Sequence, residues 1–158
     1  MSTPHARSVV SSPLGDLTLE ASASGLCAIL WGDRGRTPAP PPAERRHLER
    51  AEKELQEYFA GRRRAFSVPL DLKGTAFQRA VWKRLLEIPF GQTVSYSDVA
   101  RAIRRPRACR AVGGANRRNP VPIIVPCHRV IGASGDLVGY GGRSGLPLKR
   151  RLLQLESA

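Results

Sequence analysis

The chain begins with short runs of apolar and β-branched residues at 7–11, 16–21 and 25–31, separated by turn-forming triplets at 13–15 and 22–24. This pattern is typical of β-strands. A Pro-rich stretch at 37–42 predicts an extended loop, and Leu48, Ala51, Leu55 and Phe59 form the apolar face of a helix over 43–60. Residues 65–72 are expected to add a short strand. Residues 1–70 therefore predict a small α+β domain.

Residues 71–158 predict a mostly helical second domain. Capping boxes at 75–78 and 95–98 open two helices, the first ending before residue 91 and the second at 103. Pro106 ends the second helix, and a third is expected over 107–115. Two short helices joined by a tight turn, with Arg107, Arg110 and Arg117 on one face, match a helix-turn-helix. Periodicity alone leaves an ordinary helical hairpin equally open.

Charge is segregated along the chain. The formal net charge is +13, and residues 1–71 hold 10 basic against 9 acidic residues, whereas residues 72–158 hold 16 against 4. A basic surface kept for solubility would not need this separation. Since neutralising phosphates releases counterions and drives binding, nucleic acid is the favoured partner.

Composition excludes several classes of protein. With 41% hydrophobic and 25% charged residues, the chain is neither collagen-like nor disordered. The longest apolar stretch, residues 121–127, is far shorter than the roughly 20 residues of a membrane span, and no secretory signal is visible. Three cysteines without paired spacing favour a reducing compartment, so a cytoplasmic protein is expected.

Two glycines interrupt the third predicted helix. Gly113 and Gly114 each cost about 1 kcal/mol relative to alanine. Tight helix packing, or a helix that ends there, would explain them. The functional alternative is that the helix backbone approaches DNA closely, because small residues around the single long Arg110 suit a narrow groove better than a surface that reads many base edges.

Cys127 and His128 form the candidate reactive site. Three prolines at 120–126 hold the preceding backbone in a stiff, irregular segment. The neighbouring histidine and the basic surroundings favour the thiolate, which is the nucleophilic form of cysteine. A water could bridge the two side chains, with a carboxylate from elsewhere orienting the imidazole. Cys27 and Cys109 are expected to be small buried groups.

Other cysteine chemistry fits the sequence poorly. A structural zinc site needs about four ligands, typically paired at short spacing, and a thioredoxin-like site needs Cys-x-x-Cys. Neither spacing is present. Glu156 is one of four acidic residues after Leu72, and it closes a predicted helix with the stripe Leu148, Leu152 and Leu155. Spacing alone makes Glu156 a solvated charge at a helix end.

The segment from Arg110 to Val130, which includes Pro-Cys-His-Arg-Val, and the later Gly-Tyr-Gly-Gly at 139–142 resemble the O6-alkylguanine-DNA alkyltransferases. The resemblance covers residues 74–156, and residues 1–70 more loosely resemble that family's ribonuclease-H-like domain. It implies a winged helix-turn-helix second domain. The implied reaction is irreversible transfer of an alkyl group from O6-alkylguanine in duplex DNA to Cys127 after base flipping, in a single turnover that inactivates the protein.

The same resemblance implies residue roles. Cys127 would accept the alkyl group, His128 would be its base, Glu156 would orient His128, and Asn119 would brace the turn. Tyr96 would rotate the nucleotide and protonate the leaving base, and Arg110 would fill the gap left by the flipped guanine. Backbone groups would hold that guanine at Cys127, Val130, Tyr140 and Gly141. The remaining DNA contacts are expected at Ser97, Arg105, Ala111, Gly113, Gly114, Arg117 and Ala133.

The resemblance also sets expectations about partners. It suggests O4-alkylthymine as a further substrate, no cofactor, and a monomer that needs no protein partner, with cooperative binding along DNA left open. No metal is expected, because the zinc ligands of some relatives are not matched. Some relatives carry serine in place of Gly141, which leaves the tolerated alkyl size open. The rival hypothesis is a winged helix-turn-helix regulator whose cysteine is structural.

Overall fold

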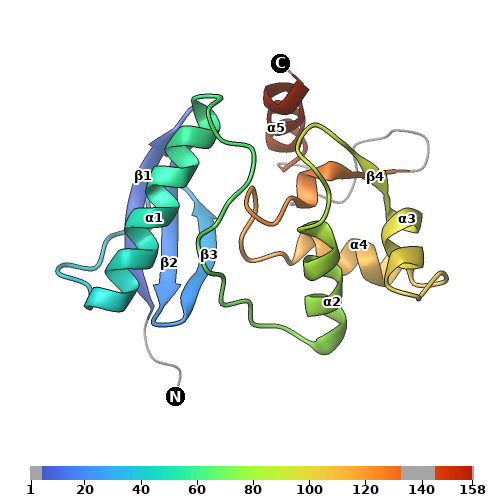
Figure 1. The fold of residues 1–158 in the computed structure, drawn as a ribbon, viewed down its shortest axis with the longest axis horizontal. Coiled ribbons are helices and arrows are strands. Elements are labelled where there is room, and N and C mark those ends of the chain that lie inside the picture. The colour runs from blue at the N-terminus through green and yellow to red at the C-terminus, as the bar shows by residue number, and fades with distance from the viewer. Residues whose placement is uncertain (1–4, 133–144, 158) are drawn as a thin grey trace. The chain divides into compact units, whose positions relative to one another are not determined.

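The computed structural model describes residues 5–132 and 145–157. The chain divides into two compact units, Met1–Lys73 and Gly74–Ala158 (Figure 1). The fold is mixed, with a small sheet and one helix in the first unit and mainly helices in the second. None of the helices within the described residues combines the length and apolar character that crossing a membrane requires.

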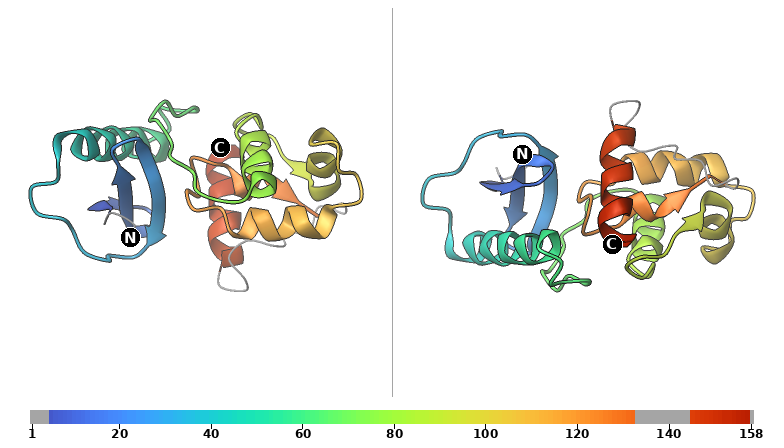
Figure 2. Two further views of the ribbon diagram at one scale, coloured as in Figure 1. Left: turned by 90° about the horizontal axis from the view of Figure 1, so that it is seen from below. Right: turned by 90° about the horizontal axis from the view of Figure 1, so that it is seen from above.

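The first unit is an antiparallel sheet with one helix along a face. Strands β1 (Ala6–Ser12), β2 (Gly15–Ser22) and β3 (Gly25–Trp31) follow one another in the order β1-β2-β3. Helix α1 (Pro42–Phe59) runs along the sheet in both views of Figure 2. Leu17, Leu19 and Ala21 alternate along β2 and are fully buried, as a strand with one covered face requires. The three strands and the helix that the pattern predicted are present.

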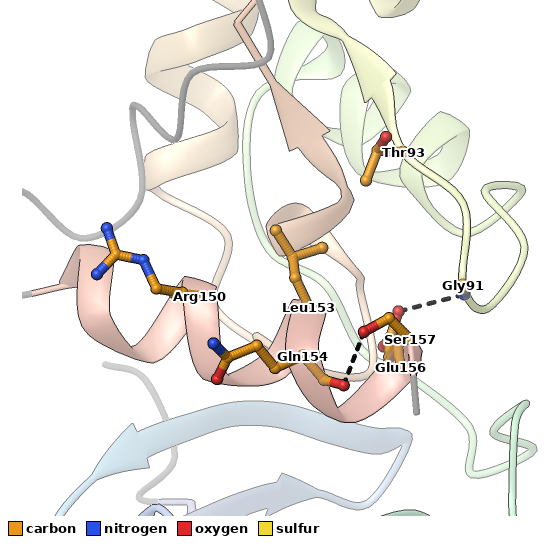
Figure 3. A pocket seen from close by; sticks show the side chains of 7 residues that line it. All are labelled: Gly91, Thr93, Arg150, Leu153, Gln154, Glu156 and Ser157. Carbon is orange, nitrogen blue, oxygen red and sulfur yellow. Dashed lines mark hydrogen bonds between the residues drawn. The ribbon is translucent and has the colours of Figure 1, made fainter.

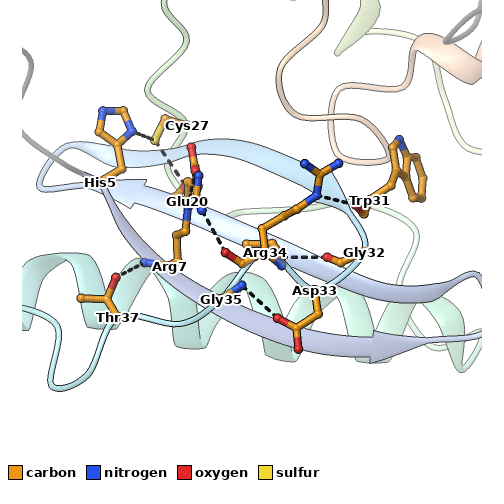
Figure 4. Close-up of polar contacts among 11 residues, drawn as sticks. His5, Arg7, Glu20, Cys27, Trp31, Gly32, Asp33, Arg34, Gly35 and Thr37 are labelled. Atoms are coloured by element: carbon orange, nitrogen blue, oxygen red, sulfur yellow. Dashed lines mark hydrogen bonds and ion pairs between the residues drawn. The ribbon is translucent and has the colours of Figure 1, made fainter.

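The loop after β3 is tied back onto the sheet (Figure 4). The backbone N–H of Arg34 donates to Thr18 Oγ1 at 2.8 Å, and the Thr18 hydroxyl donates to the Gly32 carbonyl at 2.7 Å. Arg7 adds two bonds from β1, one from its backbone N–H to Thr37 Oγ1 at 2.9 Å and one from its guanidinium to the Arg34 carbonyl at 3.0 Å. The two bonds made by Thr18 satisfy its hydroxyl, which is fully buried.

The strand predicted over 65–72 is wrong. This segment forms only an isolated parallel bridge, in which the Leu26 N–H donates to the Pro69 carbonyl and the Asp71 N–H donates to the Leu26 carbonyl, both at 2.8 Å. Pro69 has no N–H, so it cannot extend a ladder of hydrogen bonds. The segment nevertheless packs closely, because a Cβ atom on Gly25 would lie 2.6 Å from the Pro69 carbonyl oxygen.

The second unit consists of four α-helices, a 3-10 turn and two short parallel strands within its described residues. Both predicted capping boxes form, at Thr75 and at Ser95. Trp82 joins helix α2 (Ala76–Leu85) to helix α4 (Cys109–Arg117), because its indole N–H donates to the Ala115 carbonyl at 2.8 Å. The elements are α2 (Ala76–Leu85), β4 (Val94–Ser95), α3 (Tyr96–Ala102), α4 (Cys109–Arg117), η1 (Cys127–Arg129), β5 (Val130–Ile131) and α5 (Leu146–Ser157).

Candidate active site and nucleic-acid interface

The segment before the cysteine is a buried, braced turn. Asn119 bonds to it twice, donating from Nδ2 to the Val125 carbonyl at 2.8 Å and accepting at Oδ1 from the Val121 N–H at 3.0 Å. Between these bonds Ile123 has φ +75° and is fully buried. A β-branched residue in this left-handed region is strained, so the surrounding bonds must hold it there. Asn119 therefore lies where a brace is needed.

Cys127 lies at the start of η1 and is 3% exposed within the described structure. Its backbone N–H donates to the Val125 carbonyl at 2.7 Å, and its carbonyl accepts from Asn116 Nδ2 at 3.3 Å. The backbone of the predicted nucleophile is thus fixed on both sides of its Cα atom. Asn116 was not predicted as a site residue, although it lies one turn from the glycine pair on α4.

His128 is fully buried and bonds to Glu156 on the last turn of α5. Its Nε2 is 2.7 Å from Glu156 Oε2. Because an ionised carboxylate only accepts, the neutral ring carries its proton on Nε2 and leaves Nδ1 as the basic nitrogen. That Nδ1 is buried and makes no hydrogen bond within the described part of the chain. The structure therefore brings the predicted base and its predicted carboxylate together.

Arg129 shares the same carboxylate, which the sequence analysis did not foresee. Its Nε donates to Glu156 Oε1 at 2.8 Å and its Nη2 to Oε2 at 2.9 Å, a bidentate pair. Its Nη1 donates to the Ile88 carbonyl at 2.6 Å, just beyond α2. The guanidinium thus fixes both oxygens of Glu156 against the histidine. Its position inside the Pro-Cys-His-Arg-Val motif was the available signal.

Burial lowers the pKa of His128 below its ordinary value of 6.5. The hydrogen bond and the negative charge of Glu156 oppose this shift, whereas the positive charges of Arg129 and Lys149 add to it. The imidazole is therefore neutral at neutral pH. A neutral ring is the form that can accept a proton at Nδ1.

Two expectations about α5 are wrong. The buried positions of the helix are Lys149, Leu152 and Glu156, whereas Leu148 and Leu155 are half-buried. Glu156 is 5% exposed, not a solvated charge at a helix end. Its charge is tolerated in the interior because His128 and Arg129 bond to both of its oxygens. Lys149 lies seven residues earlier, two helical turns away on the same face.

Tyr96 begins α3 beside the cysteine turn. Burial, together with the negative charge of a Cys127 thiolate, raises the pKa of Tyr96 to about 12 against the opposing effect of the Asn116 side chain. The hydroxyl therefore stays protonated and can act as a donor at neutral pH. A Cβ atom on Gly113 would lie 4.0 Å from the Tyr96 ring, so α4 passes next to it.

The helix-turn-helix elements α3 and α4 present a basic outer surface. Residues 101–118 contain seven arginines and no acidic residue, and all seven arginines are exposed. The predicted contacts Arg105, Arg110, Ala111 and Arg117 are exposed, while Ser97, Gly113 and Gly114 are half-buried. A Cβ atom on Gly114 would meet nothing within 4 Å, so tight packing inside the protein does not explain this glycine.

Surface hollows in the described part of the second unit include two beside the predicted site elements. One of about 260 Å³ lies between the start of α2 and α4, and its lining includes Ala111, Gly114 and Arg118. The other, of about 320 Å³, opens beside Glu156, with Leu153 and Gln154 among its lining residues (Figure 3). Cys127 lines neither hollow. The predicted contacts Ala133, Tyr140 and Gly141 lie outside the described residues.

The other two cysteines differ from Cys127. Cys27 is buried as predicted, with its Sγ 2.7 Å from His5 Nδ1 (Figure 4), and burial raises the pKa of its thiol to about 11. Cys109 is only half-buried, so that prediction is wrong; it begins α4, with its Sγ 3.4 Å from Ser97 Oγ. The described residues contain no group of three or more histidine, cysteine or acidic side chains placed to hold a metal ion.

The fold and site define a two-unit helix-turn-helix protein with a cysteine beside a histidine–glutamate pair. Residues 76–158 match the model of the 6-O-methylguanine DNA methyltransferase DNA-binding domain, and residues 6–72 match that of its ribonuclease-like domain. The chain belongs to the 6-O-methylguanine DNA methyltransferase family.

Named relatives and solved structures agree with this placement. The chain is 48% identical over 154 residues to the methylated-DNA–protein-cysteine methyltransferase of Mycobacterium bovis, covering 94% of this chain and 90% of the relative. It is 44% identical to that of Methanosarcina barkeri, covering 94% of each. A crystal structure of Mycobacterium tuberculosis OGT in complex with DNA matches with a TM-score of 0.82 and 50% identity, covering 94% of this chain and 91% of that one.

Proposed function

We propose that the protein repairs DNA by direct reversal, moving the alkyl group of O6-alkylguanine onto Cys127. The observation that carries this proposal is the buried Cys127–His128–Glu156 arrangement, in which His128 keeps a basic Nδ1 next to the cysteine in the chain. Family membership and the matching DNA-binding domain support DNA as the partner. O4-alkylthymine is included as a second substrate of the same chemistry.

The proposed reaction is one displacement at carbon. The Cys127 proton passes through a water to His128 Nδ1, while Glu156 accepts from Nε2 and stabilises the imidazolium that forms. The thiolate attacks the alkyl carbon in line, the S–C bond forms, and the bond from that carbon to O6 breaks. The Tyr96 hydroxyl supplies a proton to the departing guanine. The product is a thioether, which has no easy hydrolysis, so the protein acts once.

The target atom lies within the base stack, so the nucleotide must be flipped before Cys127 can reach it. Flipping costs a few kcal/mol, which contacts in the pocket and the insertion of Arg110 offset. Arg110 is exposed on α4, and a Cβ atom on nearby Gly114 would meet nothing within 4 Å, which leaves the backbone there open to the duplex. We assign Tyr96 to rotation of the nucleotide, and the backbone at Cys127, Val130, Tyr140 and Gly141 to holding the guanine.

The remaining contacts are proposed for the DNA backbone. Ser97, Arg105, Arg117 and Ala133 would fix the position of the protein without reading sequence, as contacts to phosphate generally do. We propose that the protein acts as a monomer in the cytoplasm. None of the three cysteines, all within the described residues, forms a disulfide, which supports a reducing compartment.

Intact-mass spectrometry tests the proposal directly. After incubation with duplex DNA that carries O6-methylguanine, the protein should gain one methylene group, mapped to the peptide that contains Cys127. Cys127→Ser should bind the same duplex and gain no mass, because a serine hydroxyl is far less nucleophilic at neutral pH.

The rival is a winged helix-turn-helix regulator with a structural cysteine. It predicts reversible, sequence-selective binding and an unchanged mass for the wild-type protein. That result with methylated duplex would overturn the proposed function.

A further inference from the structure

Lys149 is a fully buried lysine inside the proposed acceptor site. Its side chain on α5 is 0% exposed, and its ammonium group donates to the Val130 carbonyl at 2.5 Å. The same nitrogen lies 5.8 Å from the centre of the Tyr96 ring, within the range of a cation–π contact. Burying an ammonium group is costly unless the site makes use of its charge or satisfies it. No step of the proposed reaction uses this charge.

Within the described residues, the ionisable groups around Lys149 come from three elements. Tyr96 faces it from α3, Cys127, His128 and Arg129 belong to η1, and Glu156 lies two turns along α5. Glu156 is already bonded by His128 and Arg129. His128 and Arg129 are neutral and positive respectively, and Tyr96 stays protonated. Among the described residues, a thiolate at Cys127 is an anion whose charge acts on the lysine, because it raises the pKa of Lys149.

The charges of Lys149 and Cys127 are coupled. Burial lowers the pKa of Lys149 to about 8, and the negative charge of a Cys127 thiolate acts in the opposite direction by raising it. Coupling of this kind is mutual, since a thiolate that favours the ammonium form is itself favoured by it. Lys149 is still mainly charged at neutral pH.

We propose that Lys149 is an electrostatic and positioning residue of alkyl transfer, whose ammonium group, anchored on the Val130 carbonyl, favours the thiolate form of Cys127. This inference rests on the proposed role of Cys127 as acceptor. The anchor also fixes the Val130 carbonyl, which we assign to the flipped guanine. The Lys149 side chain would thus act both on the sulfur of Cys127 and on the backbone carbonyl that is proposed to hold the flipped guanine.

The test is the ionisation of the Cys127 thiol, which needs no DNA. Brief exposure of the full-length protein to iodoacetamide over a pH series, with peptide mass spectrometry, gives the alkylation rate of Cys127 against pH. Lys149→Met, which is similar in length and uncharged, should move the midpoint upward by about one pH unit or more. Methyl transfer from duplex DNA should slow about tenfold at neutral pH and recover as the pH rises, because one unit changes the thiolate fraction about tenfold.

Matched variants separate charge from packing. Lys149→Arg keeps the positive charge and should keep the wild-type midpoint, whereas Lys149→Gln should raise the midpoint as Lys149→Met does and serves if the Met variant fails to fold. Lys53→Met removes an exposed lysine from α1 and should change neither quantity.

An unchanged thiol midpoint in a neutral variant with wild-type thermal melting would overturn the inference, even if transfer slowed. Absence of methyl transfer in the wild-type protein would instead reject the proposed function. The iodoacetamide result distinguishes these two failures.

Discussion

At the proposed acceptor site, His128 and Arg129 both donate hydrogen bonds to the carboxylate of Glu156. Glu156 accepts from His128 at one oxygen and from Arg129 at both. The arginine neutralises the carboxylate, and burial disfavours charge on the imidazole, so the histidine is held neutral with its proton on Nε2. The site thereby keeps a base available at Nδ1 without exposing it to solvent.

This arrangement predicts how stability depends on pH. In the unfolded chain His128 takes up a proton near pH 6.5, whereas in the folded protein its pKa is lower. The unfolded state therefore binds more protons just below pH 6.5, and the stability due to this group falls as the pH falls, by at most about 1.4 kcal/mol per unit. Urea unfolding at pH 7.5 and 5.5 should show a smaller acid loss for His128→Gln than for the wild type.

The comparison with His128→Gln removes the contribution of carboxylates common to both proteins. Equal losses of unfolding free energy in the two proteins would contradict the lowered pKa.

The sequence predicted the residues with local signatures better than those defined by the fold. Cys127 and His128 stand out because they are adjacent and follow three prolines. Glu156 and Lys149 could not be found from spacing, because the leucines of α5 suggest a different buried face. Only the packing of α5 against η1 shows that these two charged residues point inward. Resemblance to the family identified Glu156, and nothing in the pattern identified Lys149.

Among the elements, helix α4 is destabilised by the two glycines at its centre. Gly114 is a helical glycine, and a Cβ atom there would meet no neighbouring atom within 4 Å. Gly114→Ala should therefore stabilise the protein by about 1 kcal/mol, since alanine is the better helix former. The added methyl group should weaken binding to duplex DNA, because it occupies the surface on which we expect the duplex to lie. Thermal unfolding and a DNA titration measure the two effects.

Gly74, just before α2, provides a matched control for Gly114→Ala, because a methyl group there would meet packed atoms. A Cβ atom there would lie 2.7 Å from the Trp82 ring, which is buried and bonded to α4. Gly74→Ala should destabilise the protein by about 1–3 kcal/mol, as overpacking generally does. Stabilisation by Gly114→Ala with unchanged DNA affinity would remove the close-approach explanation for that glycine.

The helices and strands were predictable where side-chain periodicity and end signals agreed. Thr75 and Ser95 open helices because their side chains accept from the backbone three residues later. The third helix begins at Cys109, two residues after the predicted start, because residues 106–108 form the turn. The false strand at 65–72 had suitable apolar residues, but a bridge to β3 at one residue is all that Pro69 permits.

For the whole molecule, the separation of charge defines which half meets the duplex. The seven arginines of residues 101–118 are exposed on the helix-turn-helix elements, whereas residues 1–71 are nearly balanced in charge. A repair protein of the proposed kind must hold DNA without choosing a sequence. Phosphate contacts provide that kind of binding.

The salt dependence of binding tests whether the basic second unit, and not the first, contacts the DNA phosphates. Affinity for undamaged duplex should fall steeply with salt, and Arg105→Ser should reduce the slope of log affinity against log salt by about 0.9 for the one phosphate contact that is lost. Arg36→Ser removes another exposed arginine, from the first unit, and should leave the slope unchanged. A slope unaffected by Arg105→Ser would exclude this residue from the interface.

The distance along the chain between the cysteine and α5 has a consequence for biosynthesis. Glu156 follows His128 by 28 residues, so a ribosome makes the sulfur and its base well before the carboxylate that orients them. Until α5 emerges and folds, the nascent polypeptide has a nucleophile with no fixed histidine and no lysine beside it. In the proposed single-turnover reaction, this order would delay the reactivity of Cys127 until the site has folded.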